Sequence, residues 1–176
     1  RSAAAPLEIS AASGQSTDIT LTTLGVPEVS PPAGGTGFTL MRQHYTLDGA
    51  LIEGRAFAQG ERFVTVLELL PEERLGARLM INDPLPAGVE IDNPNLLRSG
   101  DLSALSWLEL SDAEHAEFRA DRFLVAVDAD GRSTIRLAYI ARAVTPGDFH
   151  APAASAEDMY RPAYRARTAT GRVIVE

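Results

Sequence analysis

Residues 122–144 read RFLVAVDADGRSTIRLAYIARAV, and this stretch decides the fold that the sequence predicts. Within it, Ser133–Val144 is expected to form a strand, because apolar and polar residues alternate along it, and it is the longest such candidate. One face should carry Ile135, Leu137, Tyr139 and Ala141, and the other Arg136 and Arg142. Asp130-Gly131 is a tight-turn signal that predicts a hairpin leading into this strand.

Similar runs, bounded by Gly, Pro, Asn or Asp, recur on both sides of this stretch. They are Leu7–Ala11, Asp18–Leu24, Phe38–Leu47, Arg62–Leu70, Leu79–Ile81, Val89–Ile91, Glu114–Arg119 and Arg172–Val175. Glu114–Arg119 and Arg122–Asp128 should form a hairpin through Ala120-Asp121, and Asn82–Gly88 is rich in turn residues. Strands at this spacing, without a sustained helical period, predict an all-β fold, an antiparallel Ig-like β-sandwich.

Composition excludes several classes of function. The chain has 176 residues, is 45% hydrophobic and has a net charge of −8, which is typical of a globular domain and disfavours nucleic-acid binding. It contains no Cys and no Lys, so thiol catalysis, cysteine zinc sites and lysine nucleophiles are excluded. No run approaches the ~18 apolar residues of a membrane-spanning helix. Because the start lacks both a Met and the apolar core of a signal peptide, we expect a fragment of a longer protein.

Four polar residues alternate along one predicted strand and its turn, namely His115, Glu117, Arg119 and Asp121. A histidine and two carboxylates can bind a metal. Arg119 and the nearby Arg122 would neutralise the acids and repel a cation, so a solvated or interdomain polar face is the preferred interpretation. We therefore predict no metal site and no cofactor.

Other candidate sites are equally weak. Gly34–Gly37 lacks the Gly-Lys-Ser/Thr ending of a phosphate-binding loop and is interpreted as a linker. His44 and His150 lie far apart, and no nucleophile-elbow motif accompanies them, so a hydrolase is disfavoured. Trp107 could anchor a sugar in a carbohydrate- or adhesion-type sandwich, which is the alternative function, but packing at the core or an edge is preferred. The chain is expected not to be an enzyme.

Separated motifs, in this order, resemble one family. They are DPLPAGVEIDNP (83–94), HAEFRADRF (115–123), RLAYIARAVTPG (136–147), and EDMYRP (157–162) followed by ARTATG (166–171). Together they resemble the C-terminal macroglobulin-like domain, MG10, of bacterial α2-macroglobulins, which is similar to the receptor-binding domain of animal homologues. The resemblance implies residues 35–176 as this domain and residues 1–34 as the final strands of a preceding CUB-like domain with a linker.

The resemblance also implies a function and a location. These proteins resemble the eukaryotic protease traps, in which a protease cuts a bait segment and the molecule rearranges to hold it. One branch carries a thioester, built from a Cys and a Gln, in a separate domain, and MG10 is expected to pack beside that domain. The implied partners are the thioester and CUB-like domains, target proteases and, by family association, a penicillin-binding protein of the 1C type. The implied location is the periplasm, with the parent protein lipid-anchored to the inner membrane.

Glu157–Pro162 holds the residues expected to make the interdomain contact. Pro162 biases Arg161 away from helix, so an extended, fixed loop is predicted. Glu157, Met159, Tyr160 and Arg161 form the predicted contact set, because aromatic and arginine side chains are enriched at interfaces. The hypothesis is that Tyr160 or a neighbour helps exclude water from the thioester domain, and the alternative is that Tyr160 pins the loop to its own sandwich.

Overall fold

The strand predicted at Ser133–Val144 forms as β9 (Ile135–Ala143) in the computed structural model of the chain, which describes residues 9, 18–22, 24, 29–74, 76–92 and 107–176. The four residues predicted on its inner face are 0–6% exposed. On the other face, Arg136 pairs with Glu68 and Arg142 lies 3.6 Å from Asp92. The alternation along β9 therefore identified the buried face correctly.

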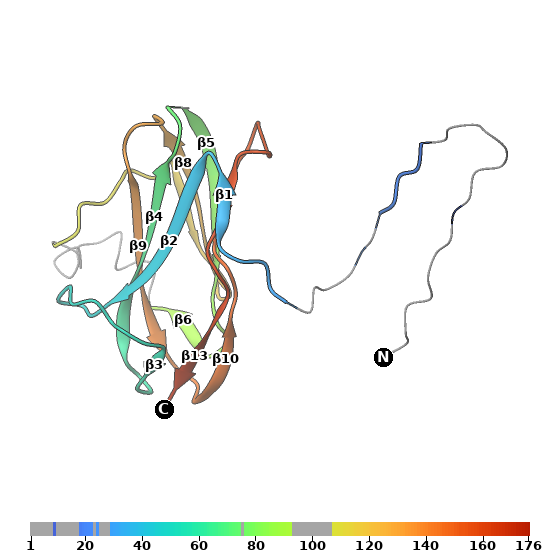
Figure 1. Ribbon diagram of the computed structural model, residues 1–176. Helices are drawn as coiled ribbons and strands as arrows, with labels where there is room; N and C mark the ends of the chain where they lie inside the picture. The colour runs from blue at the N-terminus through green and yellow to red at the C-terminus, as the bar shows by residue number, and fades with distance from the viewer. Residues whose placement is uncertain (1–8, 10–17, 23, 25–28, 75, 93–106) are drawn as a thin grey trace.

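The strands form a sandwich of two larger sheets with a smaller third sheet (Figure 1). The four-stranded sheet has the order β2 (Phe38–Tyr45), β4 (Arg62–Pro71), β9 and β6 (Val89–Ile91). The six-stranded sheet has the order β1 (Gly34–Thr36), β12 (Arg165–Arg167), β11 (Ser155–Asp158), β5 (Ala77–Pro84), β8 (Arg122–Ala129) and β7 (His115–Phe118). The third has the order β10 (Gly147–Ala151), β13 (Gly171–Val175) and β3 (Ala56–Phe57). Pairing is antiparallel apart from β3 with β13, so the predicted all-β sandwich is confirmed.

The main core lies between the inner faces of the two larger sheets. Its largest members include Phe38, Leu67, Leu69, Leu79, Ile81, Val125, Val127 and Tyr139. Burying one such side chain contributes about 1.5–3 kcal/mol, so this layer holds the sheets together. Within the described residues, no helix is long and apolar enough to cross a bilayer.

The Asp130–Gly131 turn forms, but the hairpin predicted from it does not. Gly131 has a φ of 71°, and the Asp130 carboxylate accepts hydrogen bonds from the backbone N–H groups of Arg132 (2.7 Å) and Ser133 (2.8 Å). However, β8 pairs with β5 and β7, whereas β9 pairs with β4 and β6. The turn reverses the chain while carrying it from one sheet to the other, because both strands bury a face against the shared core. The hairpin predicted through Ala120-Asp121 is confirmed as β7–β8.

The turn predicted to begin at Asn82 starts later, because β5 continues through Asp83 to Pro84. The Asp83 carboxylate is fully buried and faces two strands of the opposite sheet. Arg42 Nη1 donates to its Oδ1 (2.6 Å), and the Tyr139 hydroxyl donates to its Oδ2 (2.8 Å). Burial raises the pKa of Asp83, and these two partners oppose that rise. This contact between the sheets overrides the turn preference of the residues themselves.

The strand predicted at Asp18–Leu24 is wrong for the residues that the structure describes. Residues 18–22 and 24 form no strand, and Ile19, Leu21 and Leu24 are 58–96% exposed. An alternating segment forms a strand only beside a sheet that can take its backbone hydrogen bonds and cover its apolar face. Leu7–Ala11 lies, apart from Ile9, outside the described residues. The division of the chain after residue 34 stays a prediction.

Candidate functional site: the loop between β11 and β12

The four residues predicted to contact another domain lie on one hairpin but not on one surface. The contact loop, residues 159–164, joins β11 to β12 and stands out from the sandwich (Figure 1). At its start, Met159 is 49% and Tyr160 74% exposed. Glu157 is exposed on the outer face of β11, and Arg161 is half-buried. The sequence thus located the loop, and the structure separates its exposed tip from its anchor.

Asp158 is the anchor of the contact loop. Its side chain is 1% exposed. One oxygen, Oδ1, accepts hydrogen bonds from the backbone N–H groups of Tyr160 (2.9 Å) and Arg161 (3.2 Å), and the other accepts from Arg161 Nε (2.8 Å). Burial would raise the pKa of Asp158, but these hydrogen bonds and the Arg161 charge hold it below its ordinary value. The carboxylate is therefore ionised at neutral pH and fixes the first turn of the loop.

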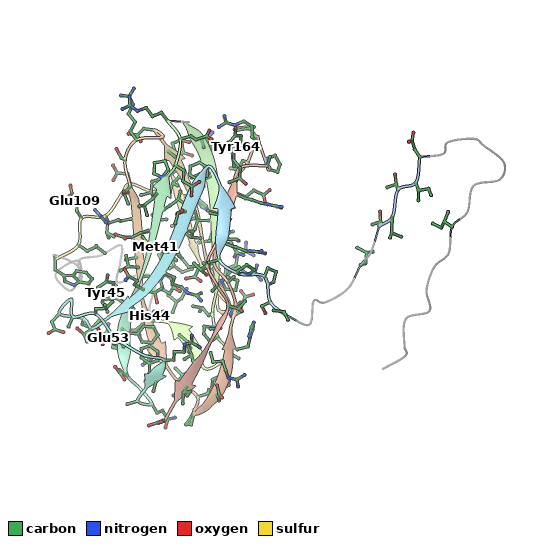
Figure 2. All side chains as sticks on the ribbon, viewed as in Figure 1. Met41, His44, Tyr45, Glu53, Glu109 and Tyr164 are labelled. Atoms are coloured by element: carbon green, nitrogen blue, oxygen red, sulfur yellow. The ribbon has the colours of Figure 1, made fainter. Side chains whose placement is uncertain are left out.

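Arg161 ties the loop to the neighbouring strand. Its Nη2 donates to the Gly76 carbonyl (2.6 Å), just before β5, and its guanidinium lies 5.3 Å from the centre of the Tyr164 ring. The Met159 N–H donates to the Arg78 carbonyl (2.9 Å), which adds a backbone link to β5. Figure 2 shows Tyr164 at the upper end of the sandwich, well apart from His44. The loop is thus held by its own side chains and backbone while its tip points outward.

Tyr160 is the most exposed aromatic side chain of the described residues. The Glu114 carboxylate and, to a lesser extent, the Tyr160 hydroxyl raise the pKa of Arg78. This polar contact involves one end of the side chain, and 74% of the Tyr160 surface still faces outward. A large amphipathic side chain on a fixed loop can fill a pocket of a partner at a small entropic cost.

The polar residues considered for a metal form ion pairs instead. Glu117 accepts hydrogen bonds from Arg119 Nε (2.8 Å) and Nη2 (2.6 Å), and His115 Nε2 lies 3.3 Å from its other oxygen. Asp121 accepts from Arg122. Among the residues that the structure describes, no group of three His, Cys, Asp or Glu side chains is placed to hold a metal ion.

A hydroxyl and an imidazole do meet, but in a place unsuited to catalysis. His44 Nδ1 lies 3.2 Å from Thr65 Oγ1, and Thr65 is 1% exposed. Burial, and then the nearby Arg42 charge, lower the pKa of His44 to about 4. A base that weak, beside a hydroxyl that substrate cannot reach, does not support the hydrolase alternative.

Trp107 packs as the sequence predicted. It joins a second, smaller apolar cluster on the outer face of the four-stranded sheet, around Val64, Val66 and Ile140. Its ring lies 5.1 Å from that of Tyr45. The side chain thus covers its own sheet rather than forming an exposed aromatic strip with other rings.

Three residues that matter to the loop were missed from sequence. Asp158, Gly76 and Arg78 fix the loop, but only Asp158 gave a local signal, because an Asp before a turn often binds the next backbone N–H groups. Gly76 and Arg78 are brought to the loop by the pairing of β11 with β5. No spacing along the chain could have indicated that contact.

Comparison with known proteins gives one consistent family. Residues 37–163 match the family model for the bacterial alpha-2-macroglobulin MG10 domain. The alpha-2-macroglobulin of Xylella fastidiosa (strain Temecula1) is 34% identical over 157 residues, which is 85% of this chain and 9% of that protein. That of Escherichia coli K12 is 28% identical over 178 residues, covering 96% of this chain and 11% of that protein. The chain thus spans about a tenth of the length of these curated relatives.

Solved structures agree with this result. The crystal structure of Salmonella alpha-2-macroglobulin reacted with methylamine superposes with a TM-score of 0.75 at 31% identity, over 86% of this chain and 10% of that one. The crystal structure of native Escherichia coli alpha-2-macroglobulin from domain MG7 to the C-terminus superposes with a TM-score of 0.73 at 29% identity, over 86% of this chain and 25% of that one. The arrangement of the sheets is therefore similar to that of part of these proteins.

Proposed function

Because the chain belongs to the bacterial alpha-2-macroglobulin MG10 domain family, we propose that it is a non-catalytic domain of a protease trap. In this proposal, it packs against the thioester domain of its parent protein through the contact loop. Cleavage of the bait by a protease releases this contact, and the domain moves. The proposed partners are thus the other domains of the same chain, and target proteases through the parent protein.

The observation that carries the proposal is an exposed, apolar tip on an anchored loop. Met159 and Tyr160 are exposed, while Asp158 and Arg161 hold the backbone beneath them. Met159 and Tyr160 are already partly covered, so burying the rest of each in a partner would contribute less than the about 1.5–3 kcal/mol of a fully buried side chain. A contact of this size is strong enough to order two domains in one chain and weak enough to be released, as is typical of interdomain interfaces.

The test is the reaction of the intact parent protein with methylamine, followed by mass spectrometry. If the contact loop shields a thioester, Tyr160→Ala should speed the incorporation, and Tyr160→Phe should have a smaller effect. Leu51→Ala is the control, because Leu51 is also a large exposed side chain (49%, against 74% for Tyr160) but lies outside the hairpin. Equal rates of methylamine incorporation for the unchanged parent protein and the three variants would overturn the shielding role. If none of them reacts, the parent carries no thioester, and the loop is left as a scaffold or docking element.

The carbohydrate or adhesion alternative gains no support. Such modules stack sugars on exposed aromatic side chains. Among the described residues, Tyr160 is the one large aromatic side chain that is exposed, and Trp107 packs on its own sheet. Binding to a sugar array would restore this alternative.

We propose the location and the remaining partners from the family alone. The parent protein is placed in the periplasm, lipid-anchored to the inner membrane, with a CUB-like domain before this one and a penicillin-binding protein of the 1C type as a partner. Cell fractionation tests the location. Co-purification with the tagged parent tests the penicillin-binding protein.

A further inference from the structure

The outer face of the β11–β12 hairpin carries two arginines without a carboxylate partner. Arg165 and Arg167 are exposed, alternate along β12, and form no ion pair with any residue that the structure describes. Several other arginines are paired, as in Arg42 with Asp83 and Arg161 with Asp158, whereas Arg132 forms no ion pair with the described residues either. The chain has 24 acidic and 16 basic residues, so a shortage of carboxylates does not explain why these two are unpaired.

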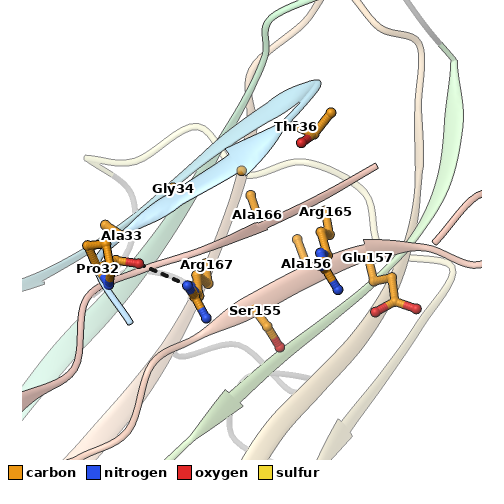
Figure 3. Close-up of a pocket in the computed structure, with 11 residues that line it drawn as sticks. Pro32, Ala33, Gly34, Thr36, Ser155, Ala156, Glu157, Arg165, Ala166 and Arg167 are labelled. Atoms are coloured by element: carbon orange, nitrogen blue, oxygen red, sulfur yellow. Dashed lines mark hydrogen bonds between the residues drawn. The ribbon is translucent and has the colours of Figure 1, made fainter. Parts of the chain in front are cut away.

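These arginines line a groove of about 550 Å³ between β1 and β11 (Figure 3). Gly34 and Thr36 border it on one side, and Ser155 and Glu157 on the other. A side chain at Gly34 would meet no atom within 4 Å, so the space around this position of β1 is open. Arg167 Nε donates to the Pro32 carbonyl (3.0 Å), which fixes that side chain beside the groove.

One carboxylate lies near the arginines and does not neutralise them. Glu157 is directly opposite Arg165 in the register of the hairpin, yet the two charged groups form no ion pair. Arg165 therefore remains free to bind a carboxylate from outside the domain. Desolvating an arginine without such a partner would be costly, so any surface that covers this groove should supply one.

We propose that this groove binds a carboxylate-bearing, extended segment from a neighbouring domain of the parent protein. Arg165 and Arg167 donate to Asp or Glu side chains of that segment, because the guanidinium fork matches a carboxylate. The segment lies in the groove, over β12 and between β1 and β11. This inference rests on the proposed interdomain role of the hairpin, since the groove and the contact loop belong to the same two strands.

Phosphate-rich partners fit the groove less well. A nucleic acid or an anionic membrane presents many phosphates and is bound through several basic residues at once. This groove offers two arginines beside Glu157, in a chain of net charge −8. A single segment with one or two carboxylates matches that charge.

The absence of lysine makes a direct test possible. Arg165→Lys gives this chain its first lysine side chain while keeping the positive charge. In the intact parent, a water-soluble carbodiimide then joins that amine to a carboxylate in contact with it. Peptide mass spectrometry identifies the coupled Asp or Glu. Arg132→Lys is the matched control, because Arg132 is also exposed and pairs with no carboxylate in the described part of the chain, but lies in the turn before β9.

The two variants should form different amounts of carbodiimide cross-link to carboxylates outside this domain. A contact within one chain has an effective concentration of about millimolar, so Arg165→Lys should couple to an Asp or Glu outside this domain more than about tenfold above the control. Coupling only to Glu157, or at the level of Arg132→Lys, would overturn the inference. This readout does not involve a thioester. Coupling at Arg165→Lys with no effect of Tyr160→Ala on methylamine would thus support the groove while refuting the shielding role.

Discussion

Replacing Asp158 with asparagine is expected to free the contact loop and destabilise the domain. Asparagine keeps one acceptor oxygen for the backbone N–H groups of Tyr160 and Arg161. It puts an NH₂ group where the carboxylate accepts from the side chain of Arg161, at 2.8 Å from Nε and 2.6 Å from Nη2. The charge-assisted hydrogen bond from Nε and the ion-pair contact with Nη2 are lost, and donors then face one another.

The size of the effect follows from this hydrogen bond and this ion-pair contact. Each hydrogen bond to a charged group contributes about 1.5–3 kcal/mol, but Arg161 is 39% exposed and water can replace part of the loss. We therefore expect about 2–3 kcal/mol in the free energy of unfolding, and a fall in Tm of roughly 4–10 °C for a domain of this size. Hydrogen exchange of the Tyr160 and Arg161 amides should speed up as well.

The assay is urea and thermal unfolding at pH 7, with Glu157→Gln as the matched control. Glu157 is the adjacent residue, is exposed and forms no ion pair with the described residues, so the same chemical change should alter stability by less than about 0.5 kcal/mol. The folded pKa of Asp158 lies below its ordinary value of 3.8. The contribution of Asp158 to the free energy of unfolding is therefore present above about pH 4 and disappears as the pH falls through the folded pKa. At that pH, Asp158→Asn and the unchanged chain should have similar free energies of unfolding.

Equal unfolding curves for Asp158→Asn and Glu157→Gln at pH 7 would refute this reasoning. They would mean that the buried carboxylate does not hold the loop. The rigidity of the tip would then need another source, and Asp158 would not preform the contact.

Two further predictions concern the core and the edge strand. Burial lowers the pKa of His44 from 6.5 to about 4. The contribution of neutral His44 to the free energy of unfolding is therefore complete above pH 6.5 and falls toward pH 4, by about 2 kcal/mol between pH 7.5 and 5.0. Urea unfolding at the two pH values should show this loss in the exposed-site variant His150→Gln but not in His44→Gln, and an equal loss in both would count against it. In Gly35→Ala, the new Cβ would lie 2.4 Å from the Phe38 carbonyl oxygen, so we expect a loss of about 2 kcal/mol or more and faster amide exchange in β1. Gly76→Ala is its control, with 3.4 Å to the nearest atom; similar melting temperatures for the two would contradict the steric argument.

The local sequence pattern was sufficient to predict the structure wherever the alternation of side chains or a single turn decides it. The alternation along Ser133–Val144 predicted which face of β9 is buried, and Ala120-Asp121 predicted the β7–β8 hairpin. Glu157–Pro162 indicated the exposed loop. In each case the signal is an alternation or a turn among neighbouring residues, so a short run of sequence contains the whole signal.

Contacts between distant strands were beyond the reach of the sequence. The sequence around Asp83 predicts a turn. In the structure Asp83 lies in a strand, because Arg42 and Tyr139 from the other sheet bind its carboxylate. The Asp130-Gly131 turn signal is the same for a hairpin and for a crossover between sheets.

The family, the all-β sandwich and the place of the contact loop were thus determined by the sequence alone. The tertiary structure decided that Asp158 and Gly76 anchor the loop and that Tyr160 projects from it. It also leaves Arg165 and Arg167 beside an open groove, without a carboxylate partner among the described residues. The physical reason is that burial and charge pairing depend on which strands lie side by side. That order is set by the packing of the whole core and not by any local run of residues.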